Sequence, residues 1–297
     1  MGDGYGGRPG WGYDEGRSDL ALESAEPADE VAEERVDVGG APVVVTRRRE
    51  VDGGRSVTLD CGRITARGES ERLGLSELLA AELTGLSEAL LGRPMGPGDG
   101  VLVAGLGNIH MTPDAIGPRT VGRLTVTRHL RSWDEGLFAA LGCCELSALA
   151  PGVLGQTGME SGELIRAAVE LVHPRLLLAV DALAARSCAR LTSTIQLSDQ
   201  GIAPGAGIGN HRMAITQETM GCPVISLGVP TVVDSSTLVL DALERAGMAV
   251  DTLPTELAEV LEGGRSFIVT PRDCDEMTDL TCRLLARGIN LAFGASE

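Results

Sequence analysis

Residues 101–119 read VLVAGLGNIHMTPDAIGPR, and this stretch decides the kind of fold that the chain can adopt. The apolar run 101–104 predicts a buried strand, and the Gly-Leu-Gly that follows it lets the backbone turn tightly. Thr-Pro-Asp then predicts the start of a helix, with Thr as its cap, Pro at its first position and Asp114 in its first turn. From this stretch alone, Asp114 either complements the helix dipole or serves as a functional carboxylate.

The chain beyond this stretch repeats the change from apolar run to helical pattern. Further apolar runs begin near residues 146, 176, 223 and 266. Patterns of helical spacing cover residues 118–130, 161–172, 182–190, 236–246 and 276–292. Such alternation predicts an α/β fold, with a parallel-type twisted sheet that carries helices on both faces.

Upstream of this core, the sequence predicts a hairpin and a helix. Two β-rich runs within residues 41–62 flank an Asp-Gly-Gly turn, which is typical of a β-hairpin. Residues 73–92 carry apolar side chains at helical spacing. We therefore expect a single α/β domain over 41–297, with this N-terminal hairpin and helix in 41–95 and the sheet core in 100–297.

The first 40 residues differ in composition from the rest of the chain. They are Gly-rich at first and then acidic, and such a composition does not supply a packed core. We expect residues 1–19 to be separate from the domain and residues 20–40 to form an acidic flexible segment.

Composition excludes several classes of function. The net charge is -17 and aromatic residues make up only 2% of the chain, which argues against binding nucleic acid through phosphates or stacked bases. All 25 basic residues are arginines, which excludes lysine catalysis and a Walker-type phosphate loop. No apolar run approaches the roughly 20 residues of a membrane span, so no membrane partner is expected. Seven cysteines without a C-x-x-C pair fit a reducing cytoplasm.

A second carboxylate stands at the end of another apolar run. Asp181 directly follows the five apolar residues 176–180. Because the carboxyl ends of parallel strands meet at one edge of a sheet, Asp114 and Asp181 can lie close together. Two adjacent carboxyl groups share a proton, so that one can activate water while the other protonates a leaving group.

Two other kinds of site remain open from the residues alone. Asp114 and Asp181, with His110 as a third ligand, could hold a divalent metal ion in a metal-dependent peptidase. Gly105-Leu106-Gly107 could bind a nucleotide, although the third glycine of a dinucleotide fingerprint is absent.

Two further features carry weaker predictions. Residues 197–212 read LSDQGIAPGAGIGNHR and predict a loop that lines the substrate groove, with Asp199, Gly205, Gly207, Gly209 and Asn210 as its candidate residues. Cys188 lies beside two arginines and is either a reactive thiol or a buried structural one.

Several long motifs in order resemble the germination proteases of spore-forming bacteria. The motifs are GLGNIHMTPDAIGPRTV (105–121), APGVLGQTGMESGELI (150–165), AVDALAARS (179–187), STIQLSDQGIAPGAGIGN (193–210), ETMGCPVISLGVPTVVD (218–234) and GINLAF (288–293). The resemblance covers about residues 95–235 and resumes near 266–293. It implies an aspartic-type endopeptidase without a cofactor, whose core is similar to that of the proteases that mature hydrogenases.

The resemblance also implies roles, partners and a location. Asp114 in T-P-D-A and Asp181 in D-A-L-A-A-R match the proposed catalytic pair of the family. The implied substrates are small acid-soluble spore proteins, the implied assembly is a homotetramer, and the implied location is the cytoplasm of the forespore and the spore core. Residues 235–265 are more compact than the insertion that family members usually carry there.

Family members are made as zymogens that remove a short N-terminal piece of their own chain. The matching stretch here is GRSDLALESAE, residues 16–26. The resemblance therefore implies cleavage between Asp19 and Leu20, with residues 1–19 as the propeptide.

Overall fold

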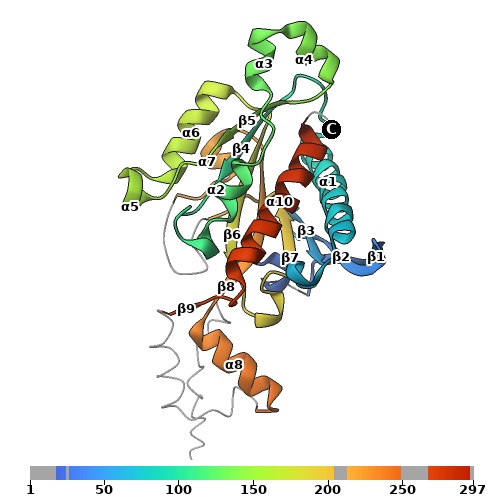
Figure 1. Cartoon of the computed structure of the whole chain (residues 1–297), viewed down its shortest axis with the longest axis vertical. Helices are drawn as coiled ribbons and strands as arrows, with labels where there is room; N and C mark the ends of the chain where they lie inside the picture. Colours follow the sequence, from blue (N-terminus) through green and yellow to red (C-terminus); the bar gives the residue numbers. More distant parts are fainter. Residues whose placement is uncertain (1–17, 25–26, 204–212, 249–266, 295–297) are drawn as a thin grey trace, which may run out of the picture.

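A computed structural model of the chain describes residues 18–24, 27–203, 213–248 and 267–294. Within these residues the chain forms an α/β fold around one mixed sheet of nine strands, with the order β1-β2-β3-β7-β8-β6-β4-β5 and β9 paired to β8 (Figure 1). The predicted α/β class is confirmed.

The parallel half of the sheet contains β4, the strand with which the stretch 101–119 begins. Its strands run in the order β5-β4-β6-β8 and comprise β4 (Gly100–Gly105), β5 (Glu145–Leu149), β6 (Leu176–Ala184) and β8 (Val224–Asp234). All four were predicted from their apolar runs, because strands that are buried on both faces contain little else.

The other half of the sheet is antiparallel, so the prediction of a parallel-type sheet is correct only for four strands. Its members are β1 (Glu30–Val38), β2 (Ala41–Arg49), β3 (Arg55–Asp60), β7 (Thr194–Ser198) and the short β9 (Ile268–Val269). Only two residues separate β1 from β2 and five separate β2 from β3, and such short connections join antiparallel neighbours. β1 lies within the segment 20–40 that was expected to be flexible.

The helices cover both faces of the sheet. On one face lie α1 (Glu69–Leu91), α2 (Ile116–Val121) and α10 (Cys274–Phe293), with α1 and α10 side by side (Figure 1). On the other lie α6 (Ser161–Val172) and α7 (Gln217–Met220). The remaining helical segments are η1 (Ala21–Ser24), η2 (Ile64–Ala66), η3 (Thr112–Asp114), α3 (Arg128–Trp133), α4 (Glu135–Leu141), α5 (Leu154–Thr157), η4 (Cys188–Arg190) and α8 (Ser235–Arg245).

The predicted helices fare unequally. Those expected at 73–92, 161–172, 236–246 and 276–292 correspond to α1, α6, α8 and α10. The helix expected at 118–130 is two separate helices, α2 and α3. The helix expected at 182–190 is wrong, because β6 continues through Ala184 and pairs there with β8. Sheet pairing overrides the helical preference of this Ala- and Leu-rich stretch.

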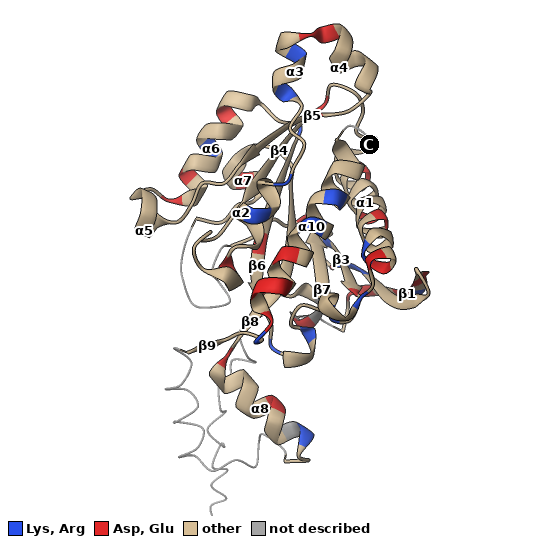
Figure 2. Cartoon of the chain, in the orientation of Figure 1, with Lys and Arg blue, Asp and Glu red and all other residues tan. Residues whose placement is uncertain are grey.

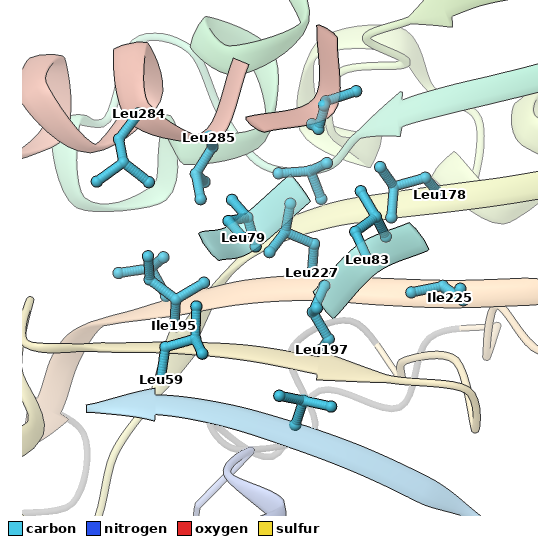
Figure 3. Packing of buried hydrophobic residues seen from close by; sticks show 14 of the residues in the cluster. Leu59, Leu79, Leu83, Leu178, Ile195, Leu197, Ile225, Leu227, Leu284 and Leu285 are labelled. Carbon is cyan, nitrogen blue, oxygen red and sulfur yellow. The ribbon is translucent and has the colours of Figure 1, made fainter. Parts of the chain in front are cut away.

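The core consists of two layers, one on each face of the sheet. Successive strand residues point to opposite faces, so Val101 and Val103 pack under α1 and α10 while Leu102 and Ala104 pack under α6. Figure 3 shows the first layer, in which leucines of α1 and α10 cover aliphatic residues of the strands, among them Leu79, Leu83, Leu284 and Leu285 over Leu178, Leu197, Ile225 and Leu227.

Figure 2 marks the charged residues of α1 and α10 along the ribbon, and none of them belongs to this core layer. Among the described residues, no helix combines the length and the apolarity that a membrane span requires.

The first core layer depends on α10. Leu285 is fully buried in it, whereas Leu291 on the same helix is 39% exposed. We predict that Leu285→Ala lowers the free energy of unfolding by about 3 kcal/mol, since it leaves a cavity. Leu291→Ala is the matched control and should cost less than about 1 kcal/mol. Urea unfolding of both variants measures the difference, and equal losses would contradict this account of the core.

Candidate active site

The loop after β4 is bonded to β6 at the residue that precedes Asp181. β4 ends at Gly105, which lies in register with Val180. The next residue, Leu106, donates its backbone N–H to the Val180 carbonyl at 2.8 Å. This hydrogen bond fixes the start of the glycine-rich loop against the carboxyl end of β6.

A glycine lets α2 pack directly on this junction. A Cβ atom at Gly117 would lie 2.3 Å from the Leu106 carbonyl oxygen and 2.4 Å from that of Val180. Any other residue would therefore push α2 off the ends of β4 and β6. The segment η3, which carries Asp114 and precedes α2, is tied to β8 as well, because Thr231 Oγ1 donates to the Pro113 carbonyl at 2.7 Å.

The Asp114 carboxylate is held by the loop itself. Its Oδ2 accepts a hydrogen bond from the Asn108 backbone N–H at 2.8 Å. Gly107 has a φ of 106°, and a Cβ atom there would lie 2.0 Å from the Asp114 carbonyl oxygen and 2.9 Å from its Oδ1. The half-buried carboxylate thus lies over a position that only glycine can fill.

Asp181 is a buried residue of β6. Only 6% of the residue is exposed, and its Oδ1 accepts the Ala182 backbone N–H at 2.8 Å. Asp181 thus directly follows Val180, the residue whose carbonyl binds Leu106, and the Asp114 carboxylate is bonded to Asn108, two residues beyond Leu106.

Two polar residues that the sequence did not single out support this loop. Asn108 Oδ1 accepts the His110 backbone N–H at 3.0 Å and Gln156 Nε2 at 2.8 Å. Asn108 thus links the Asp114 carboxylate to α5. No pattern in the sequence could have paired Asn108 with Gln156, because 48 residues separate them. His110 itself is exposed on the loop.

Asp199, the one candidate residue of the predicted substrate loop that the structure describes, does not lie at the carboxyl edge of the parallel strands. β7 is antiparallel to β8, so Asp199 lies past Ser198, which pairs with Ser226 near the amino end of β8. There Asp199 Oδ1 accepts the Arg55 backbone N–H at 2.7 Å. The other candidates lie outside the described residues; they are Gly205, Gly207, Gly209 and Asn210.

The candidate metal site and the candidate reactive thiol find no support in the described part of the chain. In those ranges, no three His, Cys, Asp or Glu side chains are grouped as they would be to hold a metal ion. Burial, with a smaller contribution from a hydrogen bond to Asp241, raises the pKa of the Cys188 thiol to about 11. Cys188 is therefore a protonated, unreactive thiol at neutral pH.

The residues of the predicted propeptide junction lie on β6 as well. Asp19 donates its backbone N–H to the Ala184 carbonyl at 3.0 Å, and Leu20 is fully buried. The junction thus lies three residues beyond Asp181 along the same strand.

Comparison with known proteins gives one consistent answer. The germination protease family model matches residues 18–246. A germination protease of Clostridium acetobutylicum is 37% identical over 266 residues, which cover 81% of this chain and 78% of that protein. One from Clostridium perfringens is 35% identical over 321 residues, covering 93% of this chain and 94% of its own. One from Caldanaerobacter subterraneus is 36% identical over 310 residues, with 93% and 94% covered.

The position of Asp114 should depend on Gly107. We predict that Gly107→Ala lowers the free energy of unfolding by at least about 2 kcal/mol more than Gly40→Ala does. Gly40 is the matched control, because its φ is 93° but nothing lies within 4 Å of a Cβ atom there. Both variants strain the backbone, and only the first displaces Asp114. Chemical denaturation measures the difference, and equal costs would show that the Asp114 segment moves aside freely.

Proposed function

We propose that this chain, which belongs to the germination protease family, cleaves peptide bonds with Asp114 and Asp181 as its catalytic pair. Family membership makes the chain a spore germination endopeptidase. The observation that supports the assignment of the pair is that the hydrogen bond from Leu106 to Val180 joins the loop that binds Asp114 to the strand position just before Asp181. The carboxyl edge of the sheet is where α/β proteins place their chemistry.

In the proposed mechanism one carboxylate and one carboxylic acid divide the work. The carboxylate takes a proton from a water molecule, whose oxygen forms the bond to the carbonyl carbon of the substrate. The C–N bond then breaks, and the carboxylic acid gives its proton to the leaving nitrogen. The two groups end with exchanged protonation states, and one proton shared between them restores the starting state.

The contacts of each aspartate suit such a pair. A backbone N–H binds one oxygen of each side chain, from Asn108 for Asp114 and from Ala182 for Asp181. A main-chain donor cannot swing away as a side chain can, so both carboxyl groups keep their orientation. Gln156 supports the first of these donors through the Asn108 side chain.

We further propose that small acid-soluble spore proteins are the substrates and that the enzyme is made as a zymogen cut between Asp19 and Leu20. The position of Asp19 on β6, three residues past Asp181, supports this cleavage site. The forespore and spore core as location, the homotetramer and the likeness to hydrogenase-maturation proteases remain predictions of the family resemblance.

The aspartate pair is tested by conservative replacement. We predict that Asp114→Asn and Asp181→Asn each lower the cleavage rate of a small acid-soluble spore protein by about 10²–10⁴-fold. Asp234→Asn is the matched control, because Asp234 also ends a parallel strand but caps α8 through Thr237, a role that Asn fills equally well. Cleavage followed by mass spectrometry should show the loss only in the first two variants. Full activity in either of them would refute the pair.

Self-processing gives a separate test. We predict that purified full-length protein sheds residues 1–19, so that its intact mass corresponds to a chain starting at Leu20. Full-length Asp181→Asn should keep its N-terminus when incubated alone, because it lacks the proposed catalytic group. N-terminal sequencing identifies the cut, and a new N-terminus elsewhere would contradict the proposed junction.

A further inference from the structure

β6 extends beyond the end of β4, so part of its edge on the β4 side is not paired with β4. β4 ends opposite Val180, whereas β6 continues through Ala184. Backbone groups of even-numbered residues point to this edge, since the Val180 carbonyl binds Leu106 while the Ala185 N–H binds β8 at the Val232 carbonyl. The stretch just after Asp181 therefore offers backbone hydrogen bonds to an added chain.

The chain's own N-terminal segment uses this edge. Asp19 donates its backbone N–H to the Ala184 carbonyl at 3.0 Å, and its Oδ2 accepts the Ala184 N–H at 2.8 Å. Two residues nearer to Asp181 along β6, the Ala182 N–H is bound by the Asp181 carboxylate. The segment thus contacts the strand edge at Asp19 and then turns into η1, with the Glu23 N–H bonded to the Leu20 carbonyl. Backbone contacts along the edge of a strand are a common mode of peptide recognition.

Gln196 of β7 holds the backbone on both sides of Leu20. Its Nε2 donates to the Asp19 carbonyl at 3.2 Å, and its Oε1 accepts the Ala21 N–H at 2.6 Å. Gln196 is 6% exposed, so its amide is fixed in the core. Because both contacts are to backbone atoms, this clamp would hold a peptide of any sequence.

Leu20 enters an apolar pocket beside the Asp181 position. It is fully buried and packs with Leu183, Ala185 and Val233. Leu183 follows Asp181 by two residues, so their side chains point to the same face of β6. The pocket thus requires an apolar side chain close to the carboxylate edge.

Glu23 is held by two arginines. Its Oε2 accepts the Arg186 backbone N–H at 2.7 Å, and its Oε1 lies 3.3 Å from Arg190 Nε. The Glu23 side chain is only 7% exposed, and the Arg186 guanidinium also binds the Glu23 carbonyl. Arg190 Nη1 is buried and has no hydrogen-bond partner within the described ranges. Arg190 thus places a side-chain positive charge next to the carboxylate at this position.

We propose that these contacts form the peptide-binding groove of the enzyme and that Arg190 makes it selective for an acidic residue three positions after the one in the apolar pocket. Residues 18–23 occupy the groove as a built-in substrate. The inference rests on the proposed function, because Leu20 follows the bond that the enzyme is proposed to cut. Cleavage of that bond removes Asp19, with its bonds to Ala184 and Gln196. The shortened segment is then held by fewer contacts, and an incoming peptide that makes all of them displaces it.

Two synthetic peptides test the groove of the enzyme, which is expressed as the full chain and allowed to process itself. One copies residues 14–27 and the other carries Glu23→Gln. We expect wild type to cleave the first with a kcat/KM at least tenfold higher than the second. Arg190→Gln should reduce this ratio to below twofold, and Arg190→Lys should keep an intermediate ratio because it retains the charge. Arg283→Gln is the matched control and should keep the full ratio, since Arg283 pairs with Asp279 on the outer side of α10.

The outcomes distinguish a failure of the proposed groove from a failure of the proposed protease function. A tenfold ratio that survives in Arg190→Gln would place the recognition of the acid elsewhere and overturn the assignment. Equal cleavage of both peptides by wild type would overturn the groove's selectivity and leave the protease function intact. Cleavage of neither peptide, with no self-processing and a native circular dichroism spectrum, would overturn both proposals.

Discussion

One backbone hydrogen bond, from the Leu106 N–H to the Val180 carbonyl, ties together everything placed at the carboxyl edge of the sheet. It joins the loop after β4 to the strand that carries Asp181. α2 packs directly on this junction, and that close approach requires Gly117, whose Cβ would collide with both bonded residues. Gly107 then makes room for the Asp114 segment. The glycines therefore allow these backbone segments to approach closely, and the position of the Asp114 carboxylate depends on that approach.

β6 has two roles because it extends beyond the end of its neighbour β4. Up to Val180 it is a central strand, with Leu176–Val180 fully buried between the two core layers. Past Val180 it carries the second carboxylate, and its edge accepts the N-terminal segment at Ala184. A strand anchored so deeply gives both features a rigid base, which positions reacting groups better than a mobile loop would.

Much of this arrangement could be predicted from the sequence, and the limits have physical causes. The parallel strands are apolar runs, and acids that follow two of these runs made Asp114 and Asp181 candidate site residues, because the chemistry of such folds gathers at the carboxyl ends of strands. β1 was missed because it is an acidic, exposed edge strand, with Val38 as its one buried residue. β7 was missed because its buried side chains include polar ones, such as Gln196, that acquire partners only in the folded chain. The same cause hid the contact between Asn108 and Gln156.

The proposed groove connects the substrate specificity of the enzyme with the inhibition of the proposed zymogen. Residues 18–23 are tethered through a few residues to β1, and such a tether gives a very high effective concentration at the groove. While Asp19 is attached, the segment occupies the contacts at Ala184, Gln196 and Arg190 that a substrate is proposed to use, so a separate peptide competes poorly. Once the bond before Leu20 is cut, the contacts at Ala184 are vacated, and these lie nearest to Asp181. The residues that select a substrate are then the same ones that keep the precursor closed, and a change in Arg190 must alter both properties together.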